Sequence, residues 1–109
     1  MAFYLEIITD KNVHEVISIL KNHPGVLGVR EFDSVNYGEG YDVEIRKIPC
    51  RLYNENTSYS NGEIEVPHNF LNIEIDRHNC SGLDEQKEIP EMLKKIITQN
   101  GLRSNVIPY

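Results

Sequence analysis

The sequence predicts an α+β domain in which two helices cover one face of a mostly antiparallel sheet. Three observations support this class: several short segments alternate in polarity, two segments have helical periodicity, and 109 residues suit one domain with one core. The order of the segments, β-α-β-β-(β)-β-α-β, predicts a ferredoxin-like β-α-β-β-α-β sandwich with an enlarged middle hairpin. We expect residues 1–109 to form a single α+β domain.

The first strand and the first helix have the clearest patterns. Residues Phe3 to Ile8 alternate between apolar residues on one side and mixed residues on the other, which predicts a strand. Thr9 and Asp10 then offer candidate N-cap oxygens, and Pro24-Gly25 ends the helix. Between them, one helix face is formed by residues at i, i+3, i+4 and i+7: Val13, Val16, Ile17 and Leu20.

The middle of the chain predicts strands separated by turn residues. Val26 to Phe32 and Tyr41 to Ile48 have strand patterns, and Pro49 is expected to end or kink the second of them. The polar segment Asn54 to Gly62 predicts a loop, and Ile64 with Val66 predicts a short strand.

The last third of the chain predicts a strand, a helix and an edge strand. Phe70 to Asp76 alternates, and Ser81 to Asp84 is expected to begin a helix with Pro90 in its first turn. Asn100-Gly101 ends this helix, and Leu102 to Ile107 predicts the edge strand. The apolar stripe of the helix consists of Ile89, Leu93, Ile96 and Ile97.

Helices on one face would leave the other face of the sheet open. The alternation of each predicted strand assigns its polar residues to that face. We therefore expect six carboxylates to share it: Glu6, Asp42, Glu44, Glu65, Glu74 and Asp76.

The formal net charge of −6 is unevenly distributed. Glu63 to Glu91 carries eight acidic residues against two basic ones, whereas the acids and bases of the other residues cancel. An acidic block repels phosphate backbones, which argues against direct nucleic-acid binding, and it attracts a basic protein. The plainer interpretation, that the charge only keeps the protein soluble, has about equal weight.

Zinc motifs are absent from the sequence. His14-Glu15 is not followed by a second histidine, because Ser18 occupies that position, so an exposed helix histidine is the better interpretation. Cys50 is not followed by a second cysteine, since Tyr53 stands there. We expect neither a metal nor a cofactor.

The stretch Ile73 to Cys80 (IEIDRHNC) combines carboxylates, an imidazole and a thiol. Cys80 as a nucleophile and His78 as its base, with Asp76 as an orienting group, would make a small enzyme. The alternative is the end of an amphipathic strand followed by a loop to the second helix. We favour the loop and a non-catalytic protein.

The chain start and its cysteines predict a compartment. The first residues lack the basic and apolar regions of a signal peptide, and no apolar run reaches the length of a membrane span. Cys50 and Cys80 suit free thiols in a reducing environment. We expect a cytoplasmic protein with no membrane partner.

In general character the chain resembles the small acidic immunity proteins encoded beside bacterial polymorphic or contact-dependent growth-inhibition toxins. The resemblance lies in the acid-rich segment Glu63 to Glu91, with its run Asp84-Glu85-Gln86-Lys87-Glu88. It implies a cytoplasmic antitoxin that covers the basic active site of a toxin domain, often a nuclease. The expected partner-binding residues are Asp42, Glu44, Tyr59, Glu63, Glu65, Glu74, Asp76, Asp84 and Glu85.

Two alternatives stay open beside this antitoxin hypothesis. A small-molecule regulatory domain of the ACT-like kind uses a similar β-α-β-β-α-β plan and often forms a homodimer. The segment Thr9 to Asn12 lacks the glycine-rich loop expected of such a domain. The enzyme based on His78 and Cys80 is the less favoured alternative.

Overall fold

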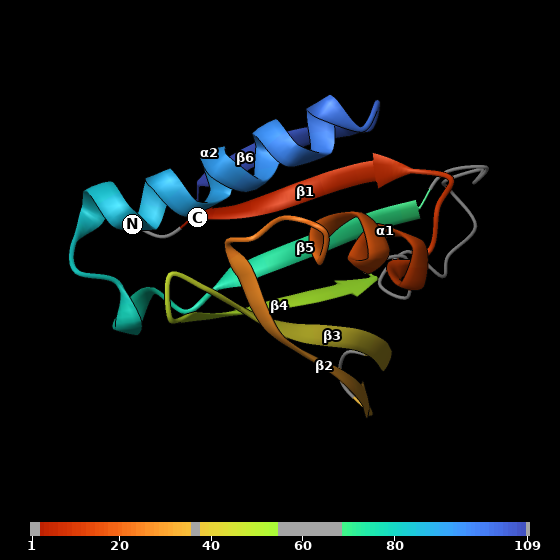
Figure 1. The fold of residues 1–109 in the computed structure, drawn as a ribbon, viewed down its shortest axis with the longest axis horizontal. Helices are drawn as coiled ribbons and strands as arrows, with labels where there is room; N and C mark the ends of the chain where they lie inside the picture. The colour runs from red at the N-terminus through yellow and green to blue at the C-terminus, as the bar shows by residue number, and fades with distance from the viewer. Residues whose placement is uncertain (1–2, 36–37, 55–68, 109) are drawn as a thin grey trace.

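The structure, a computed structural model, describes residues 3–35, 38–54 and 69–108. They form an α+β fold with a six-stranded antiparallel sheet and two helices, which confirms the predicted class (Figure 1). In chain order the elements are β1 (Phe3–Thr9), α1 (Val13–Leu20), β2 (Val26–Ser34), β3 (Gly38–Ile45), β4 (Ile48–Asn54), β5 (Asn69–Ile75), a 3-10 turn (Arg77–Asn79), α2 (Leu83–Gln99) and β6 (Arg103–Pro108).

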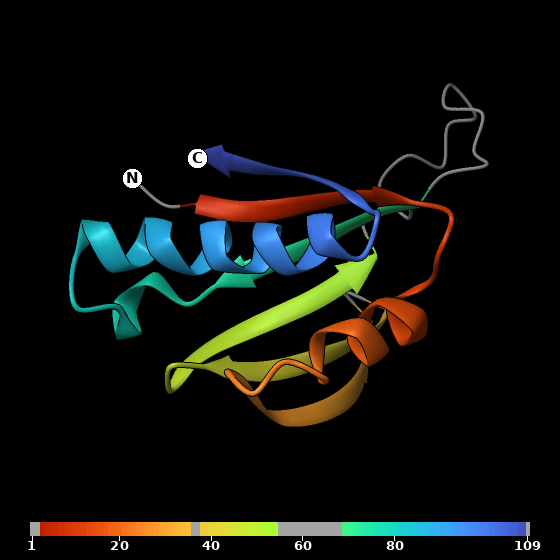
Figure 2. The ribbon, with the colours of Figure 1, turned by 45° about the horizontal axis from the view of Figure 1, so that its top comes forward.

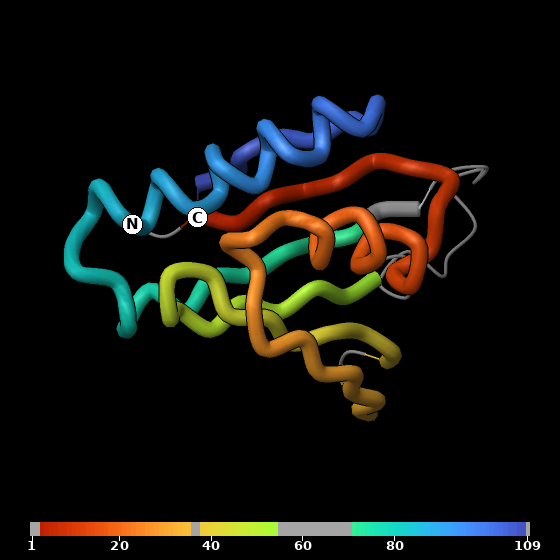
Figure 3. The backbone as a smooth tube through the Cα atoms, in the orientation of Figure 1, coloured from red at the N-terminus to blue at the C-terminus, as the bar shows by residue number. Residues whose placement is uncertain are grey.

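The strand order is β2-β3-β4-β5-β1-β6, and every neighbouring pair is antiparallel. This order differs from that of the four-stranded ferredoxin-like topology, because β3 and β4 lie between β2 and β5. Here the helix α1 joins β1 to β2 across three intervening strands, as the backbone path in Figure 3 shows. The helix α2 joins β5 to β6 on either side of β1.

Both helices lie on the same face of the sheet (Figure 2). The helix stripes pack against alternating apolar residues of β1, β3, β4 and β5, and together they form one buried cluster. The fully buried members include Leu5, Ile7, Leu20, Ile45, Leu52, Leu71, Ile73, Ile89, Leu93 and Ile97. Within the described residues, no helix has the length and apolar character needed to cross a membrane.

The prediction for the end of the second strand was wrong at Pro49. The chain turns at Arg46 and Lys47, whose φ angles are 53° and 66°, and it continues as β4. Pro49 is the second residue of β4 and pairs with Glu44. In a two-residue hairpin the pair that closes the turn is hydrogen-bonded and the next pair is not, so the missing N–H of Pro49 removes no bond to β3.

Two helix boundaries also differ from the prediction. The N-cap of α1 is Asn12, whose Oδ1 accepts a hydrogen bond from the Glu15 N–H at 2.9 Å, so neither Thr9 nor Asp10 is the cap. Pro90 lies inside α2 rather than in its first turn, because the helix begins at Leu83. The predicted strand at residues 64–66 lies outside the described residues, as does the loop predicted to follow Asn54.

Candidate functional site

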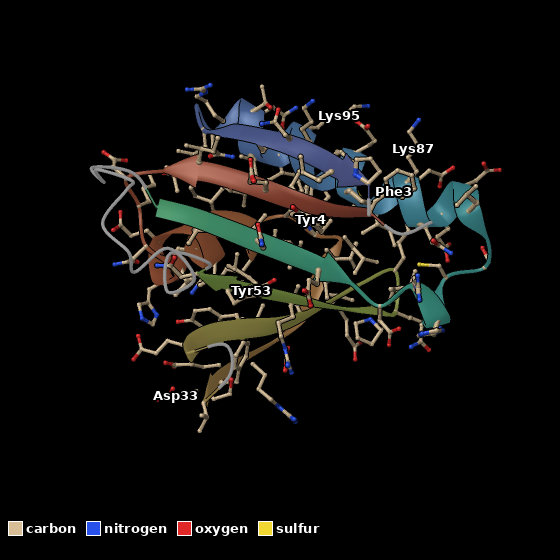
Figure 4. The ribbon with its side chains drawn as sticks, turned by 180° about the vertical axis from the view of Figure 1, so that it is seen from behind. Phe3, Tyr4, Asp33, Tyr53, Lys87 and Lys95 are labelled. Atoms are coloured by element: carbon tan, nitrogen blue, oxygen red, sulfur yellow. The ribbon has the colours of Figure 1, made fainter. Side chains whose placement is uncertain are left out.

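The candidate site lies on the sheet face opposite the helices, here called the open face. On β1, Leu5 and Ile7 are buried beneath the helices, so Tyr4 and Glu6 point to the open face. Figure 4 shows this face, with Tyr4 and Tyr53 toward the viewer and α2 behind the sheet. Directly paired residues of antiparallel strands share a face, so the register identifies the other members.

A row of alternating charges crosses the open face. The register pairs Arg30 with Asp42, Asp42 with Arg51, and Arg51 with Glu74. These four residues, here called the charged row, therefore come from four neighbouring strands, β2 to β5. Cross-strand neighbours of opposite sign stabilise the sheet, whereas like charges would destabilise it.

The centre of the charged row is a two-pronged ion pair. Arg51 Nε donates to Asp42 Oδ1 at 2.8 Å, and its Nη2 donates to Asp42 Oδ2 at 3.2 Å. The guanidinium also lies 4.6 Å from the centroid of the Phe32 ring, within cation–π range. Because each side chain of the pair is 39% exposed, solvent weakens the ion pair, and its main effect is to fix both orientations.

Gly40 leaves room for the Phe32 ring. The two residues are paired across β2 and β3, and a Cβ built on Gly40 would lie 2.7 Å from Phe32 Cζ. It would also overlap the carbonyl oxygen of Leu52. Glycine thus permits a close approach of two strands and an aromatic ring.

A second polar group is fixed beside the row. Tyr53 OH donates to Glu74 Oε1 at 2.9 Å and accepts from Asn72 Nδ2 at 3.4 Å. Asn72 is buried although it lies on the open face. The bond from Tyr53, itself held by Asn72, fixes the orientation of the Glu74 carboxylate.

A concave pocket of about 550 Å³, here called the open-face pocket, lies over β2 to β5. It contains the whole charged row together with two further carboxylates, those of Glu44 and Asp76. Four carboxylates and two guanidiniums give the lining a formal charge of −2. The remaining lining residues are Gly28, Val43, Pro49, Cys50 and Ile75.

The structure brings together four of the predicted binding residues: Asp42, Glu44, Glu74 and Asp76 all line the open-face pocket. Glu6 lies on the same face, paired with Asn72. By contrast, Asp84 and Glu85 are in the first turn of α2, which covers the other face. Tyr59, Glu63 and Glu65 lie outside the described residues.

The sequence analysis missed Arg30 and Arg51. In the sequence, the apolar residues Ile48, Cys50 and Leu52 stand at every second position. This alternation was the available signal that Arg51 lies in a strand and faces solvent, as the structure shows. The positions of Arg30 and Arg51 beside Asp42 depend on the register of β2, β3 and β4, which the sequence does not display.

The stretch after β5 is a capped turn. Asp76 is the N-cap of the 3-10 turn, where its Oδ1 accepts from the His78 N–H at 3.0 Å and its Oδ2 from Asn79 Nδ2 at 2.6 Å. His78 and Cys80 therefore do not point the same way along a strand, as the enzyme hypothesis assumed. Burial raises the pKa of the Cys80 thiol, with smaller contributions from Glu85 and Asp76. A raised pKa disfavours the thiolate that a nucleophile needs.

The other thiol is more deeply buried. Burial raises the pKa of Cys50 to about 12, and the neighbouring Cys80 and Asp76 act in the same direction. Its Sγ donates to the Ile48 carbonyl oxygen at 3.6 Å. Cys50 is thus a core residue whose sulfur stays protonated at neutral pH.

His14 makes contacts that the sequence analysis missed. Its Nδ1 lies 2.6 Å from Tyr41 OH, and its Nε2 lies 3.4 Å from Glu39 Oε2. Burial raises the pKa of Tyr41, followed by the charges of Glu31 and Glu39. This cluster connects α1 to β3 and lies outside the open-face pocket.

The described residues include no group of three or more His, Cys, Asp or Glu side chains arranged to hold a metal ion. Comparison with known proteins found no matching family model, no matching curated protein and no matching solved structure.

Proposed function

We propose that this chain is a cytoplasmic, non-catalytic binding domain of the immunity-protein kind, which neutralises a basic toxin domain by covering its active site. The observation that carries the proposal is the open-face pocket, which gathers four carboxylates on a sheet face that the helices leave uncovered. A nuclease active site that binds phosphate is basic, so it is the natural electrostatic complement of this face.

The described residues do not neutralise all the charges of the pocket. Arg51 pairs with Asp42, whereas Glu44 is exposed and forms no ion pair with any described residue. The Glu74 carboxylate accepts a neutral hydrogen bond from Tyr53 and forms no ion pair with any described residue. Lysine or arginine side chains of a partner would complete these interactions.

The carboxylates are also held on rigid elements. Asp42 is fixed by Arg51, and Glu74 is fixed by Tyr53, so a partner would not have to order them. The net charge of −6 would increase the rate of encounter with a basic protein at low ionic strength.

The test is a binding measurement with a basic nuclease domain, chosen from any toxin-like gene found adjacent to the gene of this chain. Isothermal titration at several salt concentrations should show an affinity that falls as salt rises. Glu44→Arg and Glu74→Gln should each weaken binding about tenfold or more. The matched control is Glu91→Arg on α2, which makes the same charge change as Glu44→Arg away from the open face. Equal losses for Glu44→Arg and Glu91→Arg, or no effect of salt, would contradict the proposal.

The pocket volume favours a second candidate function, that of an ACT-like small-molecule regulatory domain. About 550 Å³ lies in the range of small-ligand sites, and charges of both signs suit a zwitterion such as an amino acid. Thermal stabilisation by a panel of amino acids, lost in Arg30→Gln, would support this candidate.

A further inference from the structure

We infer that the open face also binds the open face of a second copy of this chain, in a two-fold symmetric homodimer. The inference starts from the two ends of the charged row. Arg30 is exposed at one end and Glu74 is half-buried at the other, and neither forms an ion pair with any described residue.

These two charges do not pair with each other in the described residues. Arg30 is on β2 and Glu74 is on β5, with β3 and β4 between them. Three strand spacings separate their backbones by roughly 14 Å, and the Asp42–Arg51 ion pair lies between them. Their opposite charges are therefore available to another molecule.

The charged row is complementary to its own reverse. Along the sheet its signs are plus, minus, plus, minus, for Arg30, Asp42, Arg51 and Glu74. A two-fold axis parallel to the strands, lying between β3 and β4 in the plane of contact, reverses the row in the second copy. Arg30 then faces Glu74 of the second copy, and Asp42 faces its Arg51. Symmetric dimers require such a self-complementary surface.

The same axis brings aromatic side chains of the neighbouring row together. Along this row the register pairs Phe32 with Gly40, Gly40 with Tyr53, and Tyr53 with Asn72. The same reversal places Tyr53 opposite Gly40 of the second copy, where the Phe32 ring occupies the space that a Gly40 side chain would take. The Phe32 ring lies across Gly40, where it offers the incoming tyrosine an aromatic surface.

The size of the contact predicts a weak dimer. Rotation about this axis brings only the strands β2 to β5 of the two copies into contact. These strands present roughly 450 Å² of sheet per copy, which is below the roughly 800 Å² per partner of a standard interface. The charged row is neutral in sum, but Glu44 and Asp76 give the covered pocket a formal charge of −2 per copy, which opposes association at low salt. Association should therefore depend on both protein concentration and salt.

The homodimer does not depend on the proposed antitoxin function. It would cover the open-face pocket, so a basic partner and a second copy would compete for the same residues. Self-association can be measured without any toxin, and therefore failure of one proposal leaves the other intact.

Sedimentation equilibrium of the full chain across a range of concentrations tests the homodimer. Arg30→Glu and Glu74→Arg should each lower the association constant at least about tenfold, because two contacts of opposite charge become contacts of like charge in every dimer. The double variant Arg30→Glu/Glu74→Arg should restore association to near the original value. Glu91→Arg on α2, with the same charge change as Glu74→Arg, should leave association unchanged.

Three outcomes would overturn the inference. The first is a monomer at every concentration, and the second is a dimer that ignores both single reversals. The third is a double variant that associates no better than the single ones, provided that circular dichroism shows each variant to be folded. Rescue by the double variant is the decisive result, since Arg30 and Glu74 do not contact each other within one chain.

Discussion

Gly40 shows how the absence of one side chain shapes the open face. The glycine lies in β3, where β4 approaches so closely that a Cβ would overlap the Leu52 carbonyl oxygen. The space above it is occupied by Phe32, over which Arg51 stacks. A single residue without a side chain thus positions an aromatic ring and, through it, an arginine of the charged row.

Replacing Gly40 with alanine should destabilise the chain by about 1–3 kcal/mol, because the added methyl group has no free space. Urea unfolding followed by circular dichroism measures the loss. Gly82→Ala is the steric control, since no heavy atom lies within 4 Å of its Cβ position; because Gly82 is the N-cap of α2, it should lose only the roughly 0.5–1 kcal/mol of a poorer cap, which is less than Gly40→Ala. Similar effects of the two substitutions would contradict the packing argument.

Cys50 should make the unfolding free energy depend on alkaline pH. Its pKa is about 12 in the folded chain, against an ordinary value of 9.0. Below pH 9 the thiol is protonated in both states, so its full contribution to stability is present. Between pH 9 and 12 the unfolded state loses this proton first, so the unfolding free energy falls by up to about 1.4 kcal/mol per pH unit.

The comparison that isolates this effect is Cys50→Ala against the original chain at pH 8, 9 and 10. The stability difference between them should shrink as the pH rises, because only the original chain loses the thiol contribution. Tyrosine and lysine titrations occur in both proteins and cancel. A difference that stays constant from pH 8 to 10 would show that burial does not hold the Cys50 proton.

At the scale of elements, the hairpin between β3 and β4 creates the centre of the open face. Its two turn residues both have positive φ, at 53° for Arg46 and 66° for Lys47, the conformation of a type I′ turn. That turn matches the twist of the strands and sets the register that pairs Asp42 with Arg51. Non-glycine residues in this conformation carry a steric cost.

Lys47→Gly should therefore raise the unfolding free energy by about 1 kcal/mol, because glycine removes that cost. Lys21 provides the contrast, since it caps α1 with a φ of −66°. Lys21→Gly should lower stability by up to about 1 kcal/mol, as glycine does at a right-handed helical position. Urea midpoints of the two variants should thus move in opposite directions, and a shared direction would contradict this account.

Most elements could be predicted from periodicity, because their burial follows the chain locally. The strands β1, β3 and β5 alternate, and α1 and α2 each carry an apolar stripe. The strand β4 was missed because Pro49 suggested a stop, whereas the proline lies at a position without a bond to β3. Whether a proline ends a strand can be decided only when the pairing register of that strand is known.

The candidate site could be predicted only in part, for a related reason. Alternation was enough to place Asp42, Glu44 and Glu74 on one side of their strands. The arginines between these carboxylates depend on which strands are neighbours, and that order joins β2, β3, β4 and β5. The change from a purely acidic face to a row of alternating charges is therefore a property of the tertiary fold.

At the scale of the whole molecule, one core connects both helices to the sheet. The buried cluster contains Leu20 of α1 and Leu93 of α2, together with residues of β1, β3, β4 and β5. A single continuous core predicts one cooperative unfolding transition.

Leu20→Ala and Leu93→Ala test this cooperativity, and each should cost about 2–5 kcal/mol because both side chains are fully buried. Circular dichroism and tyrosine fluorescence should follow the same urea curve in the original chain and in both variants. Two separated transitions, one for each helix, would show that the core is divided.

The internal position of β1, between β5 and the edge strand β6, has a consequence for synthesis. Its two neighbours in the sheet, β5 and β6, begin at Asn69 and Arg103, so the earliest strand pairs with the latest ones. At roughly 5–20 residues per second, several seconds pass on the ribosome before β1 can complete its hydrogen bonds. The apolar residues of β1 are uncovered during that interval. The nascent chain should therefore be a better chaperone substrate than the finished protein, and folding should await the emergence of β6.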